Sequence, residues 1–182
     1  MNGKRIWLIL PAALLPYLAL ISMAVIFFST EIPICRYLLE TVFRDNGLNL
    51  ILALFAYCMV AAVLSCICFA VSIYQSWDPL SLAKTAMLVK LLQIPAYGLI
   101  FLMGVMFMIT LFTIPFAIGL LLLDCLSVFL SGLITISAVS NAARQGLMPY
   151  RRSLWVILLQ FIFCADVIAA IVFYFKLKKH RG

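Results

Sequence analysis

Long runs of apolar residues, separated by short charged clusters, dominate this chain. A transmembrane helix needs about 20 residues to cross a hydrocarbon core of roughly 30 Å. The first two runs, residues 6–30 and 46–77, are therefore each long enough for one crossing. Runs without Asp, Glu, Lys or Arg cover residues 6–30, 46–77, 91–123, 125–143, 153–165 and 167–175.

The stretch 91–143 is too long for one crossing and contains only one such residue, Asp124. A break is expected at Thr113-Ile114-Pro115, because proline cannot continue the hydrogen-bond ladder of a helix. The last two runs join across Asp166 into one span. The pattern predicts five spans, with four or six as the alternatives, at about residues 6–29, 48–75, 88–112, 116–142 and 153–175.

The predicted fold is an all-α, polytopic membrane helical bundle that forms one domain over residues 1–182. Backbone polar groups in lipid must be satisfied within helices or closed barrels. Barrel strands alternate apolar and polar residues, whereas residues 120–123 are four consecutive leucines.

Composition supports a membrane protein. The chain has 182 residues, of which 67% are hydrophobic and 10% charged, against about half and a quarter in soluble domains. Its net charge of +7 is confined to short clusters. These features exclude a soluble globule, a disordered chain and a nucleic-acid-binding domain, so the lipid bilayer is the expected surrounding and no nucleic acid is an expected partner.

The first span also has features of a signal peptide, because Lys4 and Arg5 precede it and Ser22-Met23-Ala24 resembles a cleavage site. Its apolar run is longer than a usual signal core, which favours an uncleaved helix. Pro11 and Pro16 should bend that helix.

The distribution of basic residues does not determine how a five-span chain is oriented in the membrane. Six basic residues fall on each side, so the positive-inside rule does not distinguish the two orientations. We prefer the orientation with a cytoplasmic N-terminus. One side carries Lys4, Arg5, Lys84, Arg144, Arg151 and Arg152, and the other carries Arg36, Arg44, Lys176, Lys178, Lys179 and Arg181.

Two spans carry stripes of small and polar residues at helical spacing. Helices in lipid associate through small side chains and interhelical hydrogen bonds, so both stripes should face protein. The two stripes either pack against neighbouring helices without water or form a polar path lined by Ser65, Ser127, Ser131 and Thr135. The second-span stripe is Cys58, Ala61, Ser65, Cys68, Ser72 and Gln75, and the fourth-span stripe is Asp124, Ser127, Ser131, Thr135, Ala138 and Ala142.

Asp124 and Asp166 are the candidate proton or cation site. At 1.5 Å per residue they lie about 12 and 13.5 Å from the ends of their predicted helices, on the same face of the membrane. Intramembrane carboxylates usually face the bundle interior, and two that approach each other favour a shared proton or cation. The alternative is that each carboxyl group is protonated or hydrogen-bonded and simply joins helices.

Lys90 is predicted near the start of the third span, where a long side chain reaches the interface. We therefore interpret it as an interfacial anchor. The connection at residues 30–47 mixes charged and apolar residues, which fits either a short amphipathic helix at the interface or an ordinary loop.

Catalytic and metal-binding patterns are not found. Five of the six cysteines, Cys58, Cys66, Cys68, Cys125 and Cys164, fall within spans, and Cys35 lies in a loop. This is not a disulfide framework or a metal-ligand pattern. The one histidine, His180, lies in the terminal tail, and no hydrolase or phosphate-binding motif occurs. We expect no cofactor and no enzymatic activity.

Two segments carry a resemblance to other proteins. Residues 90–97 (KLLQIPAY) and 163–170 (FCADVIAA) resemble segments of small multi-spanning membrane proteins of uncharacterised function from Gram-positive bacteria. The resemblance implies a bacterial plasma membrane and recurring patterns around Lys90, Gln93, Pro95 and Asp166. It implies no activity.

Two functions follow as hypotheses. An accessory or immunity-type subunit would dock to another membrane protein or to a second copy, and predicts that the small-residue stripes reach the bundle exterior and stay dry. A small proton- or cation-coupled transporter or channel component would use Asp124 and Asp166 to handle a small solute or ion. It predicts a water-accessible cavity at their depth.

Overall fold

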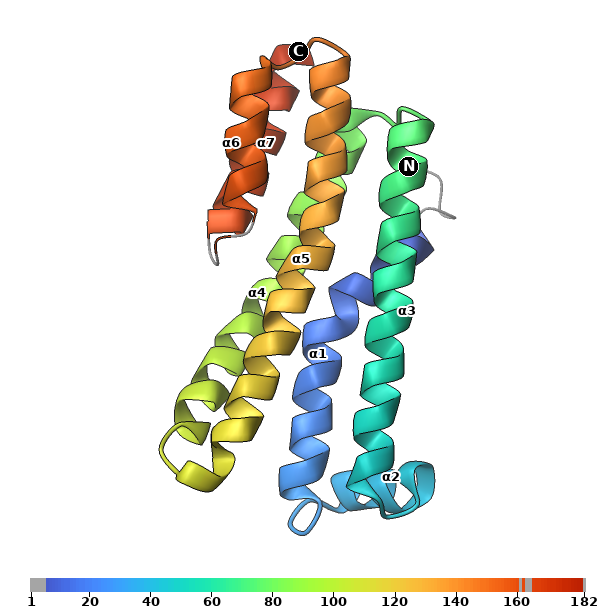
Figure 1. Cartoon of the computed structure of the whole chain (residues 1–182), viewed down its shortest axis with the longest axis vertical. Helices are drawn as coiled ribbons and strands as arrows, with labels where there is room; N and C mark the ends of the chain where they lie inside the picture. Colours follow the sequence, from blue (N-terminus) through green and yellow to red (C-terminus); the bar gives the residue numbers. More distant parts are fainter. Residues whose placement is uncertain (1–5, 161, 163–164, 182) are drawn as a thin grey trace.

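The computed structural model describes residues 6–160, 162 and 165–181, and every regular element among them is a helix (Figure 1). The predicted all-α helical bundle is confirmed. The elements are α1 (Ile6–Phe28), α2 (Pro33–Phe43), α3 (Gly47–Tyr74), α4 (Pro79–Phe107), the 3-10 helix η2 (Leu111–Thr113), α5 (Ile114–Arg144), α6 (Tyr150–Leu159) and α7 (Ala165–Arg181).

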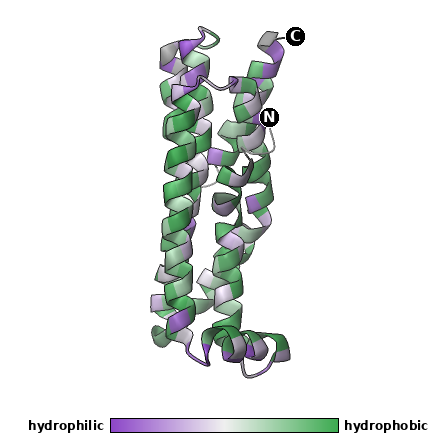
Figure 2. Ribbon diagram, turned by 90° about the vertical axis from the view of Figure 1, so that its right-hand side faces the viewer, coloured by the Kyte–Doolittle hydropathy of each residue, from purple (hydrophilic) through white to green (hydrophobic). Residues whose placement is uncertain are grey.

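Among the described residues, four helices are long and apolar enough to cross a membrane: α1, α3, α4, and α5 together with η2. Hydrophilic residues gather at both ends of these helices, and apolar residues cover most of the length between them (Figure 2). This is the distribution expected of a helical membrane protein.

Helix α4 begins well before the predicted start of the third span. Asp78 caps it by accepting a hydrogen bond from the Ser81 N–H at 2.9 Å, and Pro79 occupies the first turn, where its missing N–H costs nothing. Lys90 consequently lies eleven residues inside the helix, about 16 Å from its start. The prediction that Lys90 lies near a helix start was wrong.

The predicted break near Pro115 is confirmed. Helix α4 ends at Phe107 and α5 begins at Ile114, with Pro115 in its first turn. The Thr113 hydroxyl donates to the Phe107 carbonyl at 2.5 Å, which satisfies one backbone acceptor at the end of α4. Phe107 also stacks on Phe27 with ring centroids 4.7 Å apart, so the turn is fastened to the end of α1.

The expected fifth span at residues 153–175 is not one helix. Its residues fall on two helices, α6 and α7, which lie side by side as a hairpin that returns to the end where it began (Figure 1). The 10 residues of α6 reach about 15 Å, half of a bilayer core. On the returning helix, Phe173 and Leu177 join Ile9, Trp77 and Met148 in one core cluster. Four spans place the start of α1 and the end of α7 at the same end of the bundle.

Helix α5 is central and packs against α1, α3, α4, α6 and α7. All six residues of its small-residue stripe, from Asp124 to Ala142, are buried. On α3 the stripe is buried from Cys58 to Ser72, and only Gln75 at its end is exposed. The prediction that both stripes face protein is confirmed.

The connection between the first two spans contains α2, which lies across the end of the bundle opposite the chain termini (Figure 1). Cys35 on α2 packs against Val25 and Leu50. On its exposed face, Arg36 donates to Glu40 at 2.7 Å, and this hydrogen bond raises the pKa of Arg36 above its ordinary value. The predicted short amphipathic helix is therefore present.

Candidate functional site

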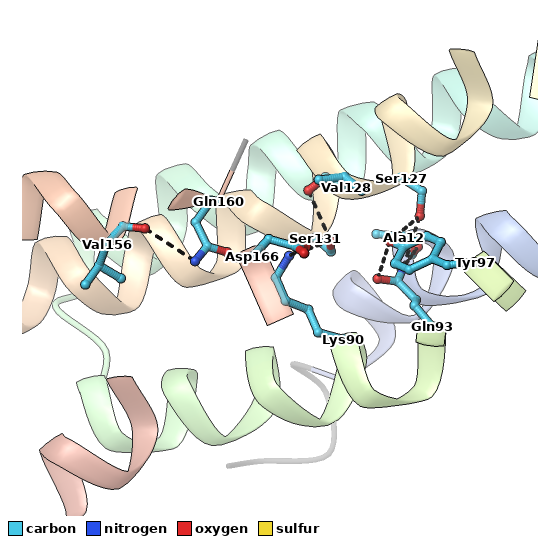
Figure 3. A network of polar contacts seen from close by, with 10 residues as sticks. All are labelled: Ala12, Lys90, Gln93, Tyr97, Ser127, Val128, Ser131, Val156, Gln160 and Asp166. Carbon is cyan, nitrogen blue, oxygen red and sulfur yellow. Dashed lines mark hydrogen bonds and ion pairs between the residues drawn. The ribbon is translucent and has the colours of Figure 1, made fainter. Parts of the chain in front are cut away.

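A fully buried ion pair lies at the centre of the bundle. The Lys90 Nζ atom is 2.5 Å from Asp166 Oδ2 and 3.3 Å from Ser131 Oγ, and the two charged side chains are 0% and 1% exposed. The three residues come from α4, α7 and α5 (Figure 3). Lys90 therefore does not reach the interface, and its interpretation as an interfacial anchor was wrong because it pairs with a carboxylate 76 positions away.

The α6–α7 hairpin places Asp166 at this depth. Asp166 lies in the first turn of α7, where the helix dipole favours a negative charge. Close packing on α5 supports the inner end of the hairpin, because a Cβ atom on Gly132 would lie 3.6 Å from the Cβ of Gln160. Ser131 and Gly132 therefore position the ion pair and the hairpin together.

A second polar network lies next to the ion pair and joins α1, α4 and α5 (Figure 3). The Gln93 amide donates to the Ala12 carbonyl at 3.0 Å and to Ser127 Oγ at 3.2 Å. The Tyr97 hydroxyl donates to Gln93 Oε1 at 2.9 Å and lies 3.3 Å from Ser127 Oγ.

Pro16 explains why Gln93 bonds to Ala12. In a regular helix the residue-16 N–H would donate to the Ala12 carbonyl, but proline has no N–H. In lipid that carbonyl needs another donor, and the buried Gln93 amide supplies it. The predicted bend of α1 is present, since α1 changes direction in its first half (Figure 1).

Asp124 lies on α5 and is not paired with a basic side chain among the described residues. It is 6% exposed, and its Oδ1 atom is buried with no hydrogen-bond partner. Among the described residues it takes part in no salt bridge. Asp166 and Ser131 both contact Lys90 Nζ, and Ser131 is seven residues from Asp124 along α5, about 10 Å of helix rise. Of the two predicted carboxylates, only Asp166 has a lysine partner among the described residues.

Asp124 also lines a groove between α4 and α5 with a volume of about 330 Å³. The other lining side chains carry no formal charge and are mostly large and apolar. Asp166 is enclosed with Lys90, whereas Asp124 borders this groove.

The four predicted polar-lining residues are all buried, but they separate into two groups. Ser127 and Ser131 contact the two networks. Thr135 lies one turn further along α5, and its hydroxyl oxygen has no partner. Ser65 is buried on α3, which packs against α1 and α5, and it contributes no contact to either network in the described structure.

Sequence reasoning missed Lys90, Gln93 and Tyr97 as members of the site. A signal was present, because these residues step by three and four positions along α4, which places them on one helical face. Each is a strong hydrogen-bonding residue inside an apolar run. A polar stripe on one membrane helix is expected to contact polar side chains on a neighbouring helix, and α5 carries such a stripe.

The described cysteines lie on three helices, α2, α3 and α5. Cys66 and Cys125 are exposed, and Cys35, Cys58 and Cys68 are buried. No group of three or more His, Cys, Asp or Glu side chains that could hold a metal ion occurs within the described ranges. Cys164, which we placed within a span by its sequence, lies outside them.

Comparisons of the chain with protein-family models, curated proteins and solved structures gave no match. The resemblance to Gram-positive membrane proteins therefore stays a prediction. The two segments that carry it do meet in the fold, since they contain Lys90 and Asp166.

The charge balance of the site limits its chemistry. The buried charged residues in the described structure are Lys90, Asp124 and Asp166, so full ionisation leaves one negative charge in excess. An unpaired charge at the centre of a bilayer costs about 2.5–3.5 kcal/mol or more. A proton or a bound cation at Asp124 would remove this excess charge.

Proposed function

We propose that this chain is a small membrane transport component in which Asp124 exchanges a proton for a cation. The observation that supports the proposal is the pairing of two buried carboxylates with a single buried lysine. Lys90 neutralises Asp166, so Asp124 is the group whose charge must be balanced by something that arrives from outside.

The two networks have different roles in this proposal. The Lys90–Asp166 pair and Ser131 fix the α6–α7 hairpin to the bundle. Gln93 and Tyr97 hold α4 against α1 and α5. Both networks join neighbouring helices, so they keep the helices in register while Asp124 changes its proton or its bound ion.

The alternative hypothesis, an accessory or immunity-type subunit, called for small-residue stripes on the exterior of the bundle. Helices α3 and α5 bury these stripes instead. Docking to a membrane-protein partner or a second copy would then need another surface, and this is why ion handling is the preferred proposal.

The distribution of basic residues supports one orientation. With four spans, eight basic residues of the described helices lie at the end that carries the chain termini: Lys84, Arg144, Arg151, Arg152, Lys176, Lys178, Lys179 and Arg181. Only Arg36 and Arg44 lie at the other end, and by sequence Lys4 and Arg5 precede α1. The positive-inside rule then assigns the terminal end to the cytoplasm, and the resemblance favours a bacterial plasma membrane.

Infrared difference spectroscopy tests the proposal directly. The purified protein in detergent should show the C=O stretch of a protonated carboxyl group that disappears as pH rises or a cation is added. Asp124→Asn should remove this band. Glu40→Gln, on the exposed face of α2, is the control carboxyl outside the bundle. A spectrum without the band, or a band that no pH and no cation changes, would contradict the proposal.

A further inference from the structure

The groove between α4 and α5 has an unusual lining for a membrane-facing surface. Its rim is formed by exposed residues, which are Phe101, Val105, Met108, Ile118, Leu121 and Cys125. Asp124 is the one carboxylate among the lining residues. Its side chain is 6% exposed, and its buried Oδ1 atom has no hydrogen-bond partner.

This lining suits one class of ligand. Inorganic cations such as Na⁺ and Ca²⁺ need several oxygen ligands to replace their water, and the groove provides the oxygens of a single carboxyl group. An organic cation with aryl or alkyl substituents keeps no tight hydration shell. Its apolar body would contact the apolar walls while its charge meets Asp124.

We propose that the α4–α5 groove binds a lipophilic organic cation, such as a quaternary ammonium ion, in exchange for the proton on Asp124. This inference rests on the proposed function and names the cation that Asp124 takes. Binding converts the Asp124 carboxylic acid and the free cation into a carboxylate–cation pair and one released proton. The site is neutral before and after, so neither state leaves an unpaired charge in lipid.

The neighbouring titratable groups do not replace Asp124 in this exchange. Lys90 on α4 and Asp166 on α7 neutralise each other, and the Tyr97 hydroxyl is engaged with Gln93. Helix α1 carries Tyr17, and α3 carries Tyr57 and Cys58. Phenols and thiols are ordinarily neutral near neutral pH, which leaves Asp124 as the group that can release the proton.

The test uses benzyltrimethylammonium as the probe and neopentylbenzene, its neutral carbon isostere, as the matched ligand. Calorimetry on the whole protein in detergent should detect the cation binding, and a pH dye in weak buffer should report close to one proton released per cation bound. The isostere and Na⁺ should release none. Asp124→Asn should abolish both binding and proton release.

A second variant blocks the groove without touching the carboxylate. A Cβ atom on Gly104 meets nothing within 4 Å, so Gly104→Leu should fill the groove without a backbone clash and weaken binding at least tenfold. Gly98→Leu is the matched control, because Gly98 lies on the same helix, also has open space, and does not line the groove. It should bind the probe as the natural protein does.

Two exposed cysteines provide a readout independent of binding heat. Cys125 lines the groove, whereas Cys66 lies on α3. In variants that keep only one of these two cysteines, bound probe should slow maleimide modification of Cys125 at least severalfold and leave Cys66 unchanged.

Failure of this inference can be told apart from failure of the proposed function. If Na⁺ releases the Asp124 proton and benzyltrimethylammonium does not, the groove proposal is overturned while ion exchange at Asp124 stands. If the probe binds equally well to Asp124→Asn, or protects Cys66 as much as Cys125, the groove proposal is also overturned. If the infrared band of Asp124 never responds to pH or to any cation, both proposals are lost.

Discussion

Removing one partner of the Lys90–Asp166 pair should destabilise the protein far more than removing both. Lys90→Met leaves the Asp166 carboxylate without its cation in a site that is 1% exposed. Breaking a buried pair costs about 3–5 kcal/mol in soluble proteins, and a charge at a bilayer centre costs about 2.5–3.5 kcal/mol. The lost contact with Ser131 adds about 0.6 kcal/mol. We therefore expect a loss of about 3–4 kcal/mol.

Asp166→Leu should cost a similar amount, because it leaves the Lys90 ammonium buried and unpaired. The double variant Lys90→Met/Asp166→Leu replaces both charges by apolar groups and should lie within about 1–2 kcal/mol of the natural protein. The measurement is reversible unfolding by SDS in mixed micelles, followed by helical circular dichroism.

The same double-mutant cycle on the exposed pair is the control. Arg36→Met and Glu40→Leu remove an ion pair that water already solvates, so neither variant should shift the unfolding midpoint measurably. If the two losses at Lys90 and Asp166 simply add in the double variant, with a coupling below about 0.5 kcal/mol, the buried pair is not a coupled unit and the reasoning fails.

Three further predictions follow from other contacts. Gln93→Leu should lower the free energy of unfolding by about 1–2 kcal/mol in the same assay, because the Ala12 carbonyl loses its donor. Adding Pro16→Ala to Gln93→Leu should restore part of that loss, because alanine returns a backbone N–H at position 16. If the second substitution restores nothing, the role assigned to the proline is refuted. Gly132→Ala should be tolerated, since its Cβ would meet Gln160 at 3.6 Å, whereas Gly132→Leu should cost about 1–3 kcal/mol by overpacking; equal stabilities would show that this contact is not close. Reporters fused after α7 and in the α5–α6 loop should both be active in the cytoplasm, and a reporter in α2 should not; opposite activities of the first two would contradict the hairpin.

The apolar pattern predicted most of the architecture for a clear reason. Long uncharged runs have few stable alternatives in lipid, so the long helices follow from length alone. Burial of the α5 stripe also followed from local information, because helical spacing determines which residues share a face.

The hairpin could not be derived in the same way. Residues 153–175 have the length of a span, and neither proline nor glycine marks the reversal. The available signal was polarity, since Gln160 and Asp166 interrupt an apolar run near its middle. Lys90 was misplaced for a related reason. Its position depends on a partner far along the chain, and a rule about single lysines near helix ends cannot contain that information.

The half-length hairpin has a consequence for the two leaflets of the membrane. Helices α4 and α5 continue beyond the inner end of α6 and α7 (Figure 1), and the portions that continue carry the residues of the α4–α5 groove. In the proposed orientation, acyl chains of the non-cytoplasmic leaflet would contact the outward face of that half, while the hairpin would cover the half nearer the cytoplasm. An amphiphile in the outer leaflet would then have a direct lateral route to the Asp124 groove, and one in the inner leaflet would first have to pass the hairpin.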